Sequence, residues 1–233
     1  MDENFQMRFE LIQPWSTFVM KTTLPSSILE KMIRITDEIV ERELHWEADT
    51  GSVMEDQFLI DFEILEQEEV MKYFLDVCKT YVVEAFCQSH PLNKENALKE
   101  EWITWMTRFW VNSQKDNEYF PMHFHTNCDI TSVIYLKIPE YLPNRKRDGN
   151  EEDGAITFTN NSSHDKTWST PILQIQPQVG DFFILPAELR HQVYPFRTAD
   201  KKGERRSISF NAEFMSKTDM TNQPTQKHVR KTQ

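Results

Sequence analysis

The chain has 233 residues, of which 39% are hydrophobic and 27% charged, so it can bury the core of one large domain. Its 26 basic residues against 37 acidic ones give a formal net charge of -11, which disfavours an extended contact with a nucleic-acid backbone. The three cysteines form no CxxC pair, and no apolar run approaches the roughly 20 residues that a membrane span needs. We therefore expect a cytoplasmic protein with no membrane segment and with reduced cysteines.

Two amphipathic segments in the first hundred residues predict helices. A short extended segment, residues 9–19, comes first. After the turn and cap residues 24–27, apolar side chains recur at helical spacing from Ile28 to Leu44. A second apolar stripe runs from Glu66 to Gln88. Stripes of this kind normally face a core, so both helices are expected to pack on a sheet.

From Trp102 onward the chain is rich in β-branched and aromatic residues, which predicts strands. The predicted strands cover residues 102–112, 130–138, 155–159, 172–176, 182–185, 191–194 and 207–214. Short strands separated by Pro and Gly turns favour a sandwich or jelly roll over an alternating βαβ sheet. The expected fold class is mainly β with a helical N-terminal part: a cupin-like jelly roll with two supporting helices.

The predicted organisation is a single domain over residues 1–215, followed by a polar tail over residues 216–233. Within the domain, residues 24–90 give the helical support and residues 100–215 the jelly-roll core. The segment 140–154 has almost no apolar content and predicts an exposed loop. A solvated hairpin insertion is favoured there over a substrate lid.

Two histidines, His123 and His125, stand two residues apart in a predicted strand. Side chains alternate along a strand, so both imidazoles leave the same face and can share a metal ion. His191, from a distant strand, is the candidate for a third ligand. Neutral imidazole suits iron, zinc and other divalent metals, and three such ligands leave three positions open on an octahedral ion.

An arginine near the end of the chain predicts a carboxylate-binding position. A 2-oxo acid can bind a metal through its carboxylate and keto oxygens, and its distal carboxylate then needs a buried cation. Counting back in twos from Asn211 places Ser209, Ser207 and Arg205 on one polar face. Arg206 points to the opposite face, so Arg205 is favoured over Arg206 as the anchor, although the sequence leaves both open.

Other ligands are less well placed. Asp129 lies six residues after His123, roughly 20 Å along an extended strand, so only a sharp bend could return it to the site. Asn127 has the same problem at shorter range, and an amide is a poorer ligand. The remaining histidines stand in polar segments and are expected at the surface: His45, His90, His164 and His228. For His164, a position on a loop near the mouth of the site is the alternative.

Several segments together resemble the 2-oxoglutarate and Fe(II)-dependent oxygenases of marine bacteria and their phages. These segments are Trp110-Val111-Asn112, the HxH pair, residues 132–139, the turn 180–186, His191 to Pro195, and Arg205 to Asn211. The resemblance covers residues from about 10 to 214 and is most specific in the C-terminal half.

The resemblance implies a double-stranded β-helix that holds iron through His123, His125 and His191. It also implies that Arg205 binds 2-oxoglutarate, with Ser207, Tyr135 and Asn112 as supports, in a bacterial or phage-infected cell. The wider superfamily has a carboxylate, HxD or HxE, where this chain has His125. This difference leaves open whether iron or another metal is bound.

The function expected from these features is oxidation, most often hydroxylation, of a substrate by Fe(II), 2-oxoglutarate and oxygen, with succinate and CO2 as coproducts. One alternative is a three-histidine cupin-type dioxygenase that does not use 2-oxoglutarate. Another is a non-catalytic jelly-roll module, virion-associated or ligand-binding, that retains a metal. The expected partner is a small-molecule or side-chain substrate, and a homodimer is compatible with the sequence.

Overall fold

The computed structural model describes residues 17–42, 56–89, 94–142, 152–160 and 171–222. Within these ranges the chain forms ten strands and five helices. Three groups of residues named above lie outside the described part: most of the predicted extended segment 9–19, most of the predicted charged loop, and the four histidines that were expected at the surface.

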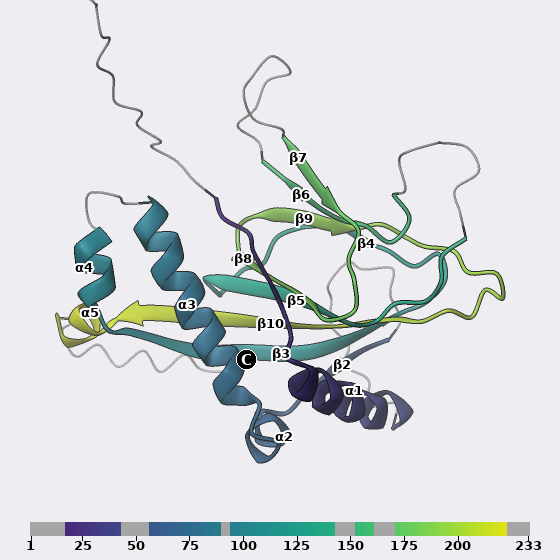
Figure 1. Cartoon of the computed structure of the whole chain (residues 1–233), viewed down its shortest axis with the longest axis horizontal. Helices are drawn as coiled ribbons and strands as arrows, with labels where there is room; N and C mark the ends of the chain where they lie inside the picture. The colour runs from purple at the N-terminus through teal and green to yellow at the C-terminus, as the bar shows by residue number, and fades with distance from the viewer. Residues whose placement is uncertain (1–16, 43–55, 90–93, 143–151, 161–170, 223–233) are drawn as a thin grey trace, which may run out of the picture.

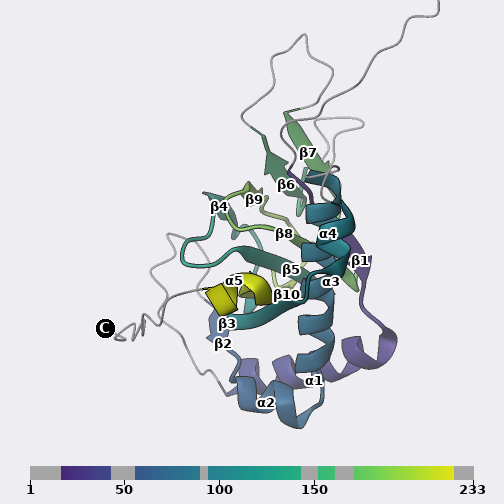
Figure 2. The same cartoon turned by 90° about the vertical axis from the view of Figure 1, so that its left-hand side faces the viewer.

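The strands form two antiparallel sheets (Figures 1 and 2). The larger sheet has the order β1 (Met20–Thr23), β8 (Asp181–Pro186), β5 (Ile130–Lys137), β10 (Arg205–Ser216), β3 (Trp102–Gln114), β2 (Gln57–Leu59). The smaller sheet has the order β4 (Phe120–His123), β9 (Arg190–Val193), β6 (Ile156–Thr159), β7 (Ile172–Ile175). This pair of sheets confirms the predicted mainly-β jelly roll. Strands β1 and β2 were not predicted.

The helices are α1 (Ser26–Glu41), α2 (Phe62–Gln67), α3 (Met71–Ser89), α4 (Lys94–Lys99) and α5 (Lys217–Asn222). The helix predicted over residues 66–88 is confirmed from Met71 onward, but its predicted beginning was wrong, because the chain breaks between α2 and α3. Glu69 adopts a left-handed conformation there, with φ of 59°, which no α-helix accommodates. Two helices were predicted where the described residues form five, and α5 begins just inside the segment predicted as a polar tail.

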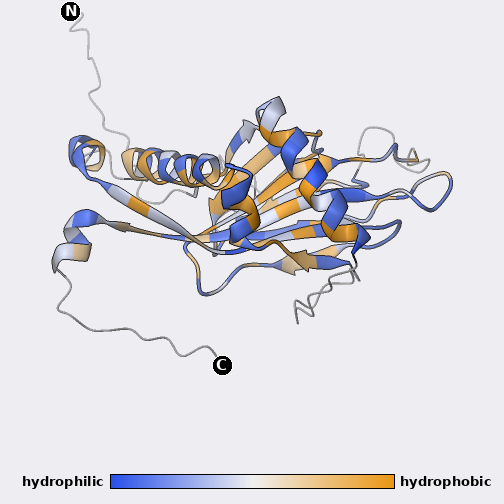
Figure 3. Cartoon of the chain, turned by 90° about the horizontal axis from the view of Figure 1, so that it is seen from below, coloured by the Kyte–Doolittle hydropathy of each residue, from blue (hydrophilic) through white to orange (hydrophobic). Residues whose placement is uncertain are grey.

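The main core lies between the helices and the larger sheet. Helices α1, α2 and α3 cover one face of this sheet, while the smaller sheet lies on the other side (Figures 1 and 2). Phe74 of α3 is fully buried, and its ring meets the edges or faces of Phe109, Phe182 and Phe210 at centroid distances of 5.2, 6.1 and 5.9 Å. In Figure 3 the helices carry both apolar residues (orange) and polar residues (blue), as expected for elements with one face in a core.

A second, smaller core lies between the two sheets. It contains apolar residues from β5, β6 and β8, among them Val133, Ile156 and Phe183. This core fills only part of the space between the sheets. The rest is a cavity lined by both polar and apolar side chains, and it forms the candidate site.

The three cysteines are free, as predicted. Cys78 and Cys87 are buried, whereas Cys128 is half-buried. Burial raises the pKa of the Cys78 thiol to about 12, so this thiol stays protonated and behaves as a packing group. No helix in the described part of the chain has the length and apolar content to cross a membrane.

Candidate active site

Two paired strands of the smaller sheet and one following turn position the three histidines. His123 is the last residue of β4 and lies directly opposite His191 of β9. His125 was predicted on the same strand, but it lies two residues beyond the end of β4. Its backbone N–H donates to the Ala187 carbonyl at 2.8 Å, which holds the turn against the β8–β9 connection.

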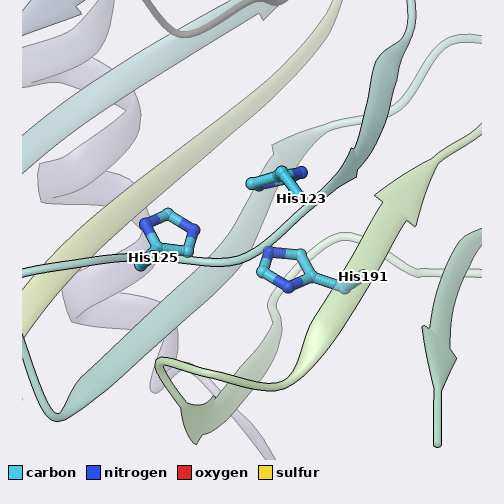
Figure 4. Close-up of side chains that lie close together, drawn as sticks. All are labelled: His123, His125 and His191. Atoms are coloured by element: carbon cyan, nitrogen blue, oxygen red, sulfur yellow. The ribbon is translucent and has the colours of Figure 1, made fainter. Parts of the chain in front are cut away.

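The three imidazole rings converge on one point (Figure 4). The ring centroids are 4.2 Å apart for His123 and His191, 5.2 Å for His123 and His125, and 5.3 Å for His125 and His191. One nitrogen from each ring lies within 4.8 Å of the others. Nitrogens about 2.0–2.1 Å from a common ion lie within this range of one another, so the three rings can share a metal.

Backbone carbonyls fix the orientation of two of the rings. Nδ1 of His123 lies 2.7 Å from the Pro121 carbonyl, and Nδ1 of His191 lies 2.8 Å from the Leu189 carbonyl. A carbonyl only accepts, so each Nδ1 carries the proton and donates it. The Nε2 atoms are therefore left with a free lone pair, which is the tautomer that a metal requires.

Burial keeps the rings neutral. Desolvation, together with the charges of the neighbouring histidines, lowers the pKa of His125 to about 3 and that of His191 to about 4. Desolvation also lowers the pKa of His123, although the hydrogen bond to the Pro121 carbonyl acts to raise it. A neutral imidazole is the form that binds a metal, so at neutral pH protons do not compete for these nitrogens.

The guanidinium of Arg205 lies in the same cavity, at the beginning of β10. Its side chain is 2% exposed and donates to the Gly154 carbonyl and to Oε1 of Gln114. It also stacks near the rings of Tyr135 and Phe196, at 5.7 and 5.5 Å from their centroids. In the described part of the chain its polar partners are neutral, and no carboxylate pairs with it. A buried charge without a counter-charge is costly, which makes this position suited to an anionic ligand.

Arg206 faces the other side of the sheet, as the alternation along the strand predicts. It pairs with Asp37 of α1 and with Glu204. Arg206 does not line the cavity, whereas Arg205 does. The structure thus brings Arg205, and not Arg206, to the side of the histidines.

The cavity lies between the two sheets, and its lining includes all seven residues that the sequence favoured for the site. Its lining is Trp110, Asn112, Gln114, Phe120, His123, His125, Ser132, Val133, Tyr135, Ile156, His191, Val193, Arg205, Ser207 and Ser209. The Tyr135 hydroxyl is buried and has no hydrogen-bond partner among the described residues. Burial raises the pKa of Tyr135, so the hydroxyl stays protonated and can donate to a ligand.

Two polar residues of this lining were not predicted as site residues, Ser132 and Gln114. Gln114 follows Asn112 by two residues on β3 and lies opposite Arg205. The period-two alternation that placed Ser207 and Arg205 together would have found it, since Asn112 and Gln114 share a face.

The alternative ligands do not reach the cluster. Oδ2 of Asp129 accepts a hydrogen bond from the backbone N–H of Phe214 at 3.1 Å, and Asp129 is not part of the group that could hold a metal. Asn127 adopts a left-handed conformation, with φ of 59°, in the turn between β4 and β5. Among the described residues the candidate metal site thus has three imidazole donors, which suit iron(II) and leave room for further ligands.

Comparison with known proteins agrees with this site. The family model described as "Putative 2OG-Fe(II) oxygenase" matches residues 108–211, a range that contains all three histidines and Arg205. No curated protein matches the chain in sequence.

The fold is similar to that of several solved structures. HygX from Streptomyces hygroscopicus, solved with nickel, 2-oxoglutarate and hygromycin B bound, has a TM-score of 0.51 and 10% identity, over 84% of this chain and 82% of that one. A Pseudomonas putida prolyl-4-hydroxylase has a TM-score of 0.46 and 15% identity, over 84% of this chain and 92% of that one. The viral collagen prolyl hydroxylase of Paramecium Bursaria Chlorella virus-1 has a TM-score of 0.46 and 14% identity, over 83% and 94%.

The likeness to HygX shows the shared double-stranded β-helix, and the family match covers the part of the chain that builds the cavity. Residues 108–211 are thus similar to 2OG-Fe(II) oxygenases, a class of enzymes whose cofactors are iron(II) and 2-oxoglutarate.

Proposed function

We propose that the protein oxidises, most often by hydroxylation, a small molecule or a side chain, and converts 2-oxoglutarate to succinate and CO2. In this proposal His123, His125 and His191 hold iron(II). Arg205 holds the distal carboxylate of 2-oxoglutarate, and the supports are Ser207, Tyr135 and Asn112.

The observation that carries the proposal is the pairing of two unsatisfied groups in one cavity. Three neutral imidazoles direct their free nitrogens to one point, and a buried guanidinium without a carboxylate partner among the described residues lies at the same cavity. A metal satisfies the three imidazoles, and a 2-oxo dicarboxylate links the metal to Arg205, because one end chelates the metal and the other pairs with the guanidinium.

Different residues of the chain would bind the metal and the cosubstrate. The carbonyls of Pro121 and Leu189 keep two imidazoles in the metal-binding tautomer. The guanidinium of Arg205 offers parallel N–H donors to a carboxylate, and the protonated Tyr135 hydroxyl adds a donor beside it. When bound, iron(II) supplies the activation of oxygen that is coupled to decarboxylation of the 2-oxo acid.

A second candidate function follows from His125, which replaces the carboxylate of the wider superfamily. A three-histidine dioxygenase that does not use 2-oxoglutarate would have the same metal ligands and no role for Arg205. The buried charge of Arg205 favours the first candidate.

The test is anaerobic reconstitution of the purified protein with Fe(II) and 2-oxoglutarate, followed by measurement of succinate before and after oxygen is admitted. We expect succinate only with oxygen, slowly without substrate and faster when a substrate is supplied. A His191→Ala variant, which removes a proposed metal ligand, should release none. Loss of oxygen from solution without consumption of 2-oxoglutarate would support the second candidate, and tight metal binding without either reaction would support a binding module.

A further inference from the structure

A row of four polar side chains crosses the larger sheet on the side of the cavity. Asn112 of β3 is paired with Ser207 of β10, and Ser207 with Tyr135 of β5. On its other side Asn112 is paired with Gln57 of β2. Gln57 lies outside residues 108–211 and was not among the predicted site residues.

Gln57 and Trp110 hold the Asn112 side chain from two directions. Nε2 of Gln57 donates to Oδ1 of Asn112 at 2.7 Å, and Nε1 of Trp110 donates to the same oxygen at 3.1 Å. All three side chains are buried, with exposed fractions of 4% for Gln57, 7% for Trp110 and 7% for Asn112. Water therefore does not substitute for these bonds, and each one restricts the amide.

The chemistry of the indole determines which way the amide points. The indole N–H is a donor only, so the atom that faces it must be the oxygen of Asn112. Nδ2 of Asn112 is then directed away from Trp110, and it lies 3.4 Å from Oγ of Ser209, another residue of the cavity lining. The cavity thus receives the N–H donors of Asn112 and not its carbonyl oxygen.

We propose that Gln57 is a positioning residue for the cosubstrate: together with Trp110 it locks the Asn112 amide so that its N–H groups face an oxyanion in the cavity. The inference rests on the proposed function, because it takes 2-oxoglutarate as the anion. A reversed amide would direct oxygen lone pairs at a carboxylate and repel it. The two hydrogen bonds to Oδ1 fix the orientation, so that the neutral amide acts only as a donor towards the ligand. Strand β2, at the edge of the sheet, thereby contributes to the affinity of the site although it does not line the cavity.

The sharpest test is Gln57→Glu, which keeps the size of the side chain and replaces the donor with an acceptor. A carboxylate at this position repels Oδ1 of Asn112 and attracts its N–H groups, which turns the amide the wrong way. Binding is measured by titration calorimetry with Ni(II), which suits imidazole ligands, and then with 2-oxoglutarate added to the Ni(II)-loaded protein. We expect the affinity for 2-oxoglutarate to fall about tenfold or more, with the affinity for Ni(II) unchanged.

Two milder variants separate positioning from a general loss of structure. Gln57→Leu and Trp110→Phe each remove one donor and should weaken 2-oxoglutarate binding about threefold, because the other donor still holds the amide. The double variant should lose about tenfold. Gln88→Glu, at an exposed position of α3, is the control for the added charge and should bind both ligands like the wild type.

The outcomes distinguish this inference from the proposed function. Wild-type protein that binds Ni(II) but not 2-oxoglutarate would overturn the proposed function itself. If the wild type binds both and Gln57→Glu and the double variant retain full affinity for 2-oxoglutarate, the lock is overturned. Equal losses of Ni(II) and 2-oxoglutarate affinity in Gln57→Leu, Trp110→Phe and the double variant would show that Gln57 only supports the fold, and would also overturn it.

Discussion

Two adjacent arginines at the start of β10 have opposite surroundings. The side chains of Arg205 and Arg206 are both almost fully buried, with exposed fractions of 2% and 4%. Arg206 faces the helices and pairs with two carboxylates, those of Asp37 and Glu204. Arg205 faces the cavity and donates to two neutral oxygens, those of Gly154 and Gln114.

The difference separates a stabilising group from a ligand-binding one. A buried ion pair whose partners are present in the folded chain is a structural feature, and breaking it is destabilising. A buried cation that lacks an anion among its described neighbours gains a counter-charge only when a ligand supplies the anion. We therefore expect substitutions at the two positions to affect different measurements: ligand binding for Arg205 and unfolding for Arg206.

Arg205→Ala should have the largest effect on ligand binding. Removing the guanidinium deletes the charge-assisted bonds to the distal carboxylate and leaves that carboxylate buried without a counter-charge. We expect the affinity of the Ni(II)-loaded protein for 2-oxoglutarate to fall by about 100-fold or more, and the affinity for Ni(II) to stay the same. Arg42→Ala, at an exposed position, is the control. Unchanged 2-oxoglutarate affinity would show that Arg205 is not the anchor.

Arg206→Ala should lower stability and spare the site. The substitution removes the Arg206 partner of the partly buried Glu204 and one of the two cationic partners of the half-exposed Asp37, which keeps Lys137, so the expected loss is about 2 kcal/mol in the free energy of unfolding. Urea unfolding of the ligand-free protein measures it. The affinity for 2-oxoglutarate at low temperature, where the variant is folded, should match the wild type. A loss of cosubstrate affinity as large as that of Arg205→Ala would contradict the division between the two faces.

Arg205→Lys tests whether the site needs the planar fork or only a positive charge. Lysine keeps the charge but cannot give two parallel bonds to one carboxylate, nor can it span the Gly154 and Gln114 oxygens in the same way. We expect a loss of about tenfold in 2-oxoglutarate affinity, smaller than that of the alanine variant. Calorimetry on the Ni(II)-loaded protein gives the value, and equal losses for the two variants would mean that geometry contributes everything and charge nothing.

The sequence predicted these two faces because strand alternation is a local property. Counting in twos along residues 205–211 was enough to separate Arg205 from Arg206, and the same rule could have identified Gln114. The convergence of His123 and His191 required the pairing of β4 with β9, which the sequence alone does not determine. It was inferred from metal chemistry and from family resemblance.

Other features depend on contacts between residues far apart in the chain. His125 was predicted on a strand, whereas it lies in a turn that is held by a backbone hydrogen bond to Ala187. Gln57 joins the site through a three-residue edge strand, which is too short to show a pattern. Asp37 meets Arg206 across 169 positions of sequence, and no local signal marks such a pair. The break between α2 and α3 was missed because the apolar stripe continues across it.

The smallest expected effect is the pH dependence of stability that comes from Asp37. This carboxylate pairs with Arg206, whereas Arg205 has no such partner among the described residues. Burial acts to raise the pKa of Asp37, but hydrogen bonds and charge from Lys137 and Arg206 outweigh it, so the pKa is lowered overall. A lowered pKa in the folded state stabilises the protein above the unfolded value of about 3.9, and this contribution is lost as the pH falls through the folded value. Because Asp37 is 41% exposed, solvent screening limits the contribution to about 1 kcal/mol or less.

Asp37→Asn removes this contribution. The difference in unfolding free energy between wild type and variant should be present at pH 7 and shrink as the pH is lowered from 5 towards 3, as followed by urea unfolding. Asp76→Asn, which breaks an exposed pair with Lys72 within one helix, should show a smaller difference at every pH. A difference for Asp37→Asn that stays constant across this range would mean that its charge does not stabilise Arg206, and the contrast between the two arginines would then rest on Glu204 alone.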